Sequence, residues 1–212
     1  MMSVKKAARE KMAAGIIEKM KLRGIEGFYA STNEEELELA KTLLKPGMSV
    51  AWGGSATLKE VGLLDYLPES GLTLIDRATA TTPEAVKQLK ADTINADYFL
   101  MSSNAITMDG MLINIDGYGN RVAYLCYGPE NVLVIAGMNK VVADVDEGIR
   151  RVRNIASPPN TIRLNKDTPC AKYGRCGDCL ADDCICCSVV VTRKSNRKNR
   201  IKVILVGEDS GF

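Results

Sequence analysis

Six of the seven cysteines lie in one segment near the end of the chain, residues 170–187. Two of them, Cys176 and Cys179, form a C-x-x-C turn, whose thiolates can bind one tetrahedral metal ion. A second pair would come from Cys170 and one of the three later cysteines, Cys184, Cys186 or Cys187. The spacing differs from the bacterial ferredoxin run, so zinc, an iron–sulfur cluster and thiol redox chemistry are all open. The alternative is a loop of reduced or disulfide-bonded cysteines that binds no metal.

A Gly-Gly-Ser loop follows an apolar strand predicted at residues 48–52. Gly53 and Gly54 end the strand, and Ser55 and Thr57 open a helix. Glycines let backbone N–H groups approach an anion, and the hydroxyls add hydrogen-bond donors. We therefore predict that an anion binds at this loop. The alternative is a tight strand-to-helix turn that Ser55 caps.

Polar residues are also dense around a short apolar strand predicted at residues 111–115. Arg121 could clamp a carboxylate with two hydrogen bonds. A second polar pair, at residues 139–140, follows a buried strand predicted at 132–136, and open α/β sheets bind ligands at the carboxyl ends of strands. Ordinary hairpin turns and a solvated lysine are the alternatives. The predicted ligand residues here are Asn104, Thr107, Asn114, Asp116, Asn120, Arg121, Asn139 and Lys140.

These segments are held by strands that alternate with helices, which predicts an α/β fold with a mostly parallel sheet flanked by helices. We expect one domain, 1–212, in which 161–187 is a cysteine-rich insertion. Cys126 is expected in the core, and Asn33 is expected to cap a helix. The predicted helices are 3–23, 34–44, 56–64, 83–90 and 144–155, with Pro158 and Pro159 ending the last. The other predicted strands are 25–30, 72–75, 97–101, 188–192 and 201–206, and a basic hairpin loop, 193–200, joins the last two.

The composition excludes several classes of protein. With 28 basic and 26 acidic residues, the net charge of +2 argues against nucleic-acid binding. No stretch approaches the roughly 18 apolar residues of a membrane span, and charges interrupt the N-terminal segment, so we expect a cytoplasmic protein without a secretory signal. The chain has no histidine. A metal site must therefore use thiolates, carboxylates or backbone oxygens, and acid–base chemistry must use other side chains.

The motifs together resemble the LUD-domain family, which is named for lactate utilisation. The likeness covers most of the chain and is carried by residues 52–58, 103–121 and 134–142. The tail resembles a subgroup with a Thr-Pro-Cys-Ala-Lys-x-Gly-x-Cys-x-x-Cys segment, here residues 168–179, and a further cysteine that best matches Cys186. The resemblance implies a fold similar to the NagB/RpiA/CoA-transferase superfamily. It favours Cys170, Cys176, Cys179 and Cys186 as metal ligands, while Cys184 and Cys187 are extra cysteines that this subgroup lacks.

Three functions follow from these features. The first is a protein that binds a small anionic ligand and supports lactate or organic-acid oxidation, together with iron–sulfur or redox partner proteins. The second is a transferase or isomerase of the superfamily type, in which Asp109 or Asp116 would act as nucleophile or base. The third is a metal-binding or redox interaction module centred on the cysteines. The sequence does not decide between a monomer and a homo-oligomer.

Overall fold

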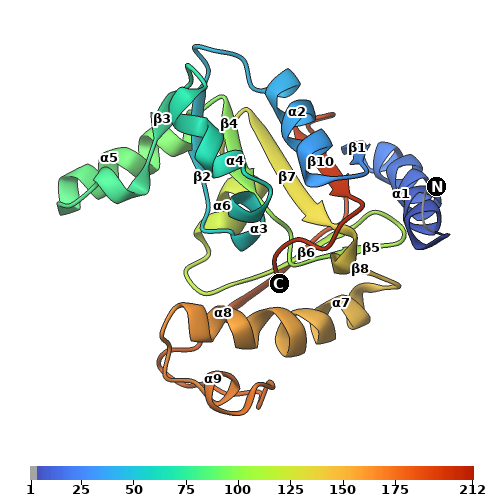
Figure 1. The fold of residues 1–212 in the computed structure, drawn as a ribbon. Coiled ribbons are helices and arrows are strands. Elements are labelled where there is room, and N and C mark those ends of the chain that lie inside the picture. The colour runs from blue at the N-terminus through green and yellow to red at the C-terminus, as the bar shows by residue number, and fades with distance from the viewer. Residues whose placement is uncertain (1–3) are drawn as a thin grey trace.

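A sheet of six parallel strands forms the centre of the protein, in the order β1-β10-β7-β4-β2-β3 (Figure 1). In the computed structural model, which describes residues 4–212, every pair of neighbouring strands in this sheet is parallel. The residues that follow the strands therefore meet at one edge of the sheet. The predicted α/β fold class is confirmed. The strands are β1 (Glu26–Ala30), β2 (Ser49–Trp52), β3 (Thr73–Ile75), β4 (Tyr98–Met101), β7 (Asn131–Gly137) and β10 (Ile201–Val206).

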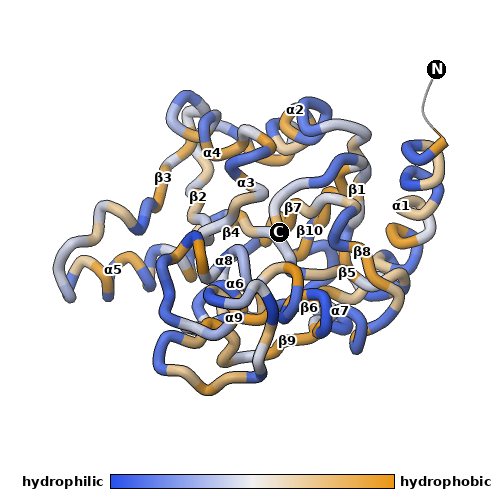
Figure 2. Tube along the Cα trace, turned by 60° about the horizontal axis from the view of Figure 1, so that its bottom comes forward, coloured by the Kyte–Doolittle hydropathy of each residue, from blue (hydrophilic) through white to orange (hydrophobic). Residues whose placement is uncertain are grey.

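Helices cover both faces of this sheet. Val132 and Val134 of β7 pack in the same core cluster as α1 (Val4–Leu22) and α6 (Asn120–Cys126). Leu133 and Ile135 point the other way, into a cluster with α2 (Asn33–Leu43), α3 (Ala56–Glu60) and α4 (Leu63–Tyr66). Because a strand alternates its side chains, an apolar run is buried on both sides. Figure 2 shows β7 and β10 as apolar segments at the centre.

A second sheet of four strands lies beside the first, in the order β8-β5-β6-β9. Strand β6 pairs antiparallel with β5 and with β9. Helix α7 (Val145–Arg151) covers this sheet, and Gly148 permits the close approach, because a Cβ atom there would overlap Ile113. The strands are β5 (Ala105–Thr107), β6 (Leu112–Asp116), β8 (Val141–Val142) and β9 (Ser188–Thr192).

The predicted hairpin between the last two strands is wrong. Strand β9 pairs with β6 in the small sheet, whereas β10 lies between β1 and β7 in the large one. The basic run between them is therefore a crossover. It is also not wholly solvated, because Arg200 is buried and donates hydrogen bonds to the carbonyl oxygens of Tyr124, Leu125 and Pro129.

Several predicted helix boundaries also differ. The helix predicted at 83–90 runs to Ile94, and the one predicted at 56–64 is divided into α3 and α4. Thr32, rather than Asn33, caps α2, because its hydroxyl accepts a hydrogen bond from Glu35 N. Pro158 and Pro159 do not end the helical segment, which continues through a π-helical turn, η4 (Val152–Ala156), into α8 (Ser157–Arg163). The prolines follow the π-helical turn directly, as the second and third residues of α8. Ser3, the first residue of the helix predicted at 3–23, lies outside the described residues.

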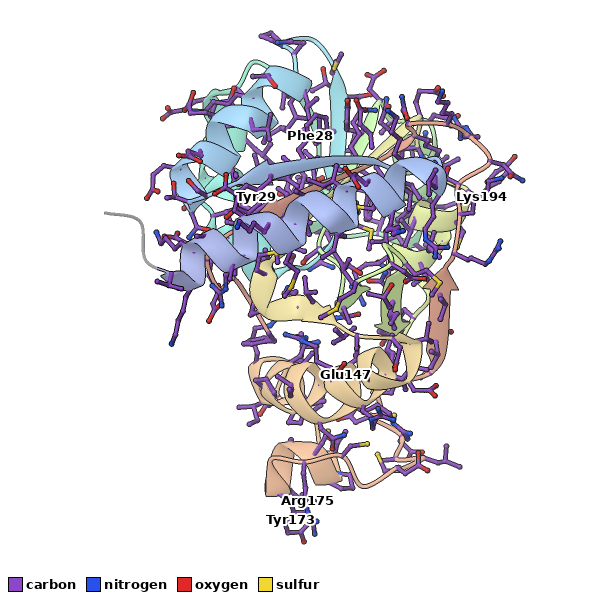
Figure 3. All side chains as sticks on the ribbon, turned by 90° about the vertical axis from the view of Figure 1, so that its right-hand side faces the viewer. Phe28, Tyr29, Glu147, Tyr173, Arg175 and Lys194 are labelled. Atoms are coloured by element: carbon purple, nitrogen blue, oxygen red, sulfur yellow. The ribbon has the colours of Figure 1, made fainter. Side chains whose placement is uncertain are left out.

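The cysteine segment lies at one end of the molecule. Helix α9 (Pro169–Tyr173) begins it, and a coil leads on to β9. Figure 3 places Tyr173 and Arg175 at the end of the molecule opposite Phe28 and Tyr29 of β1, with α7 between. Cys126 is exposed, not in the core as predicted, because the last turn of α6 presents it to solvent. Helix α5 (Pro83–Ile94) extends beside β3 (Figure 1). No helix within residues 4–212 has the length and apolar content to span a membrane.

Candidate functional site

A cavity of about 460 Å³ opens at the carboxyl edge of the large sheet. The loops after β2, β3, β4 and β7 line one side of it. The end of β6, the start of α6, the turn η4 and the coil at residues 182–187 line the other side. This position is the usual ligand site of an open α/β sheet, and the volume is in the range of small-molecule pockets.

The glycines of the 53–55 loop make room for two arginines. A Cβ atom at Gly53 would lie 3.1 Å from Cγ of Arg121, and one at Gly54 would lie 2.9 Å from Nη2 of Arg77. The loop is thus bordered by guanidinium groups, and Ser55 caps α3 by accepting a hydrogen bond from Leu58 N. The five-residue helix α3 is short, so the positive charge here comes chiefly from the side chains.

Lys140 lies beneath this loop and is only 3% exposed. Its Nζ donates hydrogen bonds to Oγ1 of Thr57, at 2.6 Å, and to Oγ of Ser102, at 3.0 Å. Both hydroxyls give their own hydrogen elsewhere, to the carbonyl oxygens of Ser210 and Ser103, so each accepts from the lysine. Burial, and then the positive charge of Arg151, lower the pKa of Lys140 to about 7, against an opposing effect of Glu60.

Arg121 and Asp116 form an ion pair at the rim of the cavity. Nε of Arg121 lies 2.9 Å from Oδ2 of Asp116, but the contact lacks hydrogen-bond alignment, and Oδ2 has no hydrogen-bond partner within residues 4–212. The other carboxylate oxygen accepts from Gly119 N, and Nη2 of Arg121 donates to the carbonyl oxygen of Ile115. Asp116 is 4% exposed, and this oxygen is buried beside the guanidinium group of Arg121.

Two asparagines and one arginine hold the loops of the site in place through hydrogen bonds to the backbone. Oδ1 of Asn114 accepts from Asn104 N, and Oδ1 of Asn104 accepts from Ile115 N. Arg151 is buried and donates to the carbonyl oxygens of Asn104 and Asn139. These bonds fix the loops after β4 and β7 relative to each other.

The structure gathers most of the predicted ligand residues at the cavity but not all. Thr107 is buried at the end of β5, where its hydroxyl donates to Asp109 and accepts from Met111 N. Asn114 and Asn139 hold backbone and neighbouring side chains and do not line the cavity. Asp109 pairs with Arg23 of the segment after α1, at 2.5 Å, and does not line the cavity. Those that line the cavity are Gly53, Gly54, Ser55, Thr57, Asn104, Asp116, Asn120, Arg121 and Lys140.

Three residues at or beside the cavity were not predicted from the sequence: Arg77, Ser102 and Arg151. Arg77 and Ser102 follow the ends of β3 and β4, so the rule that strand ends carry ligands could have found both. Arg151 stands in a helix as an ordinary basic residue, and nothing in the sequence marks it as buried.

The cysteines are free thiols, and two of them, Cys184 and Cys187, line the cavity. Burial raises the pKa of Cys184 and of Cys186, and the thiols of Cys179 and Cys187 also raise that of Cys184. Cys170 is buried with its Sγ 3.2 Å from Oγ1 of Thr168, and Cys186 lies 3.3 Å from Oγ of Ser157. In the described part of the chain, no three or more cysteine, aspartate or glutamate side chains are grouped as ligands of a metal ion.

Comparison with known proteins supports the resemblance to the LUD-domain family. A sequence model of the LUD domain matches residues 13–206. The solved structure of a DUF162 family protein from Deinococcus radiodurans is similar over 93% of this chain and 98% of that chain, with a TM-score of 0.51 and 16% identity. At that identity, the likeness shows the fold alone. The structure of eIF2B delta from Chaetomium thermophilum has a TM-score of 0.34 and 18% identity, over 50% of this chain and 46% of that chain. No curated protein matched the chain.

Proposed function

Since the chain belongs to the LUD domain family, we propose that its cavity binds a small organic anion and that the protein supports the oxidation of lactate or a related organic acid. Redox partner proteins would receive the electrons. The observation that carries the proposal is the set of three basic side chains around residues 53–57: Arg77, Arg121 and Lys140.

Not all of the positive charge at the cavity is neutralised by carboxylates of the protein, which favours an anionic ligand. Arg121 is partly neutralised by Asp116, and Lys166 by Asp183, at 3.0 Å. Arg77 has no ion-pair or side-chain hydrogen-bond partner among residues 4–212. A guanidinium group binds a carboxylate or phosphate with two parallel hydrogen bonds, so Arg77 is the anchor that we assign to the ligand.

The test is a binding measurement by calorimetry, supported by thermal shift, with lactate, pyruvate and inorganic phosphate as probes. We expect at least one of them to bind, and Arg77→Met to weaken binding by roughly 10- to 100-fold, the usual worth of a hydrogen bond to a charged group. Lys90→Met is the matched control, because Lys90 is exposed on α5, away from the cavity. No binding across the panel, or equal losses in the two variants, would overturn the proposal.

A second proposal concerns the cysteines, for which zinc or an iron–sulfur cluster stays a prediction. Cys184 lies beside Cys186 and Cys187, because its Sγ accepts a hydrogen bond from Cys186 N and its carbonyl oxygen accepts one from the Cys187 thiol. The thiol of Cys170 faces Thr161 and Thr168, so it would have to turn to join the other sulfurs. Anaerobic purification, elemental analysis and a visible absorption spectrum decide the question. A colourless, metal-free protein would remove both metals.

A further inference from the structure

We propose that Lys140 is a nucleophile that forms an imine with the carbonyl carbon of a 2-oxo acid whose carboxylate the cavity's arginines bind, an inference that rests on the anion site proposed above. Oxidation of a 2-hydroxy acid such as lactate produces a 2-oxo acid. The same carboxylate site would therefore bind both the substrate and the product of that oxidation.

The hydrogen bonds of Lys140 orient its amine. Two N–H groups of Nζ point to the hydroxyls of Thr57 and Ser102, and neither hydroxyl can donate back, because each gives its hydrogen to a carbonyl oxygen. In the neutral amine, the lone pair must therefore point in a direction that these two bonds leave open. Lys140 lines the cavity, which provides room for a carbonyl compound.

The surroundings also favour the neutral amine, which is the reactive form. Lys140 is 3% exposed, and Arg151 and Arg121 add positive charge nearby. With a pKa of about 7, roughly half of Lys140 is unprotonated at pH 7, on the order of a thousandfold more than an exposed lysine.

The reaction is balanced without an oxidant or a reductant. Nζ attacks the carbonyl carbon, the carbonyl oxygen takes up a proton, and the carbinolamine loses water to leave a C=N bond. The nitrogen gives up its protons in the same sequence. The two protons that Nζ releases are the two that the departing oxygen takes up as water, so the step needs no further acid or base.

Reductive trapping tests the proposal. The protein is incubated at pH 7 with pyruvate and cyanoborohydride, and the modified residue is located by peptide mass spectrometry. We expect one carboxyethyl group on Lys140, formed at least tenfold faster than on any surface lysine, in line with its larger neutral fraction. Acetone, which lacks the carboxylate, should label Lys140 far less. Equal labelling by acetone would refute the 2-oxo acid as the substrate class.

Peptide mapping of the unaltered protein makes the test independent of whether a variant folds. Lys140→Met, checked for folding by its melting temperature, should lose the label, while Lys90→Met should keep it. If pyruvate labels no residue, or surface lysines equally, the imine is refuted. Calorimetry with lactate and phosphate on the same sample then distinguishes the two proposals, because retained anion binding means that only the imine has failed.

Discussion

Glu36 is a buried carboxyl group whose ionisation should make the stability of the protein depend on pH. It lies in α2 with an exposed fraction of 0%, and neither carboxyl oxygen has a hydrogen-bond partner in the described residues. Burial raises its pKa from 4.5 to about 8. Because the folded-state pKa is the higher one, the unfolded chain releases this proton first as pH rises. Stability therefore falls between pH 4.5 and pH 8.

The magnitude follows from the two pKa values. Each pKa unit corresponds to 1.36 kcal/mol, so the expected loss of unfolding free energy between pH 5 and pH 7 is about 2.5 kcal/mol. The chain has no histidine, so no histidine titration adds to the change in stability between pH 5 and pH 7. Lys140, with its pKa of about 7, opposes the loss by only about 0.4 kcal/mol at pH 7, since its neutral form is favoured in the folded state.

The measurement is urea unfolding at pH 5, 6 and 7, followed by the fluorescence of Trp52, the only tryptophan. Glu36→Gln keeps the shape of the side chain but cannot ionise, so its unfolding free energy should vary less with pH than that of the unaltered protein, by about 2.5 kcal/mol across the window. Glu38→Gln is the matched control, because Glu38 is exposed on the same helix and pairs with Lys41. If Glu36→Gln and the unaltered protein show the same pH dependence, the carboxyl group is not buried in this way and the reasoning is wrong.

Two further substitutions, each with a matched control, test the packing. Gly148→Ala should destabilise the protein by about 1–3 kcal/mol in urea unfolding, because the added Cβ overlaps Ile113, whereas Gly15→Ala, in open space on α1, should stabilise it by roughly 0.5–1 kcal/mol. Equal effects would contradict the close contact of α7 with the small sheet. Arg200→Met should lower the unfolding free energy by about 2–4 kcal/mol, since it leaves three buried carbonyl oxygens without their donor, while Arg197→Met removes only an exposed pair with Glu130 and should change it by less than about 1 kcal/mol.

The fold class could be predicted because the strands and helices that alternate along the chain have recognisable local sequence patterns. The bounds predicted for β9 and β10 agree with the structure, and Ser55 caps α3 as its side chain suggests. The pairing of β9 and β10 could not be predicted in the same way. Neighbouring strands joined by a short loop usually pair, and only the burial of Arg200 and the contacts of β10 with β1 and β7 show otherwise.

That error in pairing also explains why the sequence did not reveal the environment of Lys140. Since β10 lies inside the large sheet, the residues after it cross the carboxyl edge and cover the loop after β2. The carbonyl oxygen of Ser210 accepts from Thr57, Gly211 N donates to Glu60, and Asn139 donates to the carbonyl oxygen of Gly211. These contacts lie next to Lys140, whose Nζ donates to the same Thr57 hydroxyl. The burial of Lys140 is thus linked to a strand more than 60 residues away in the sequence, which no local motif encodes.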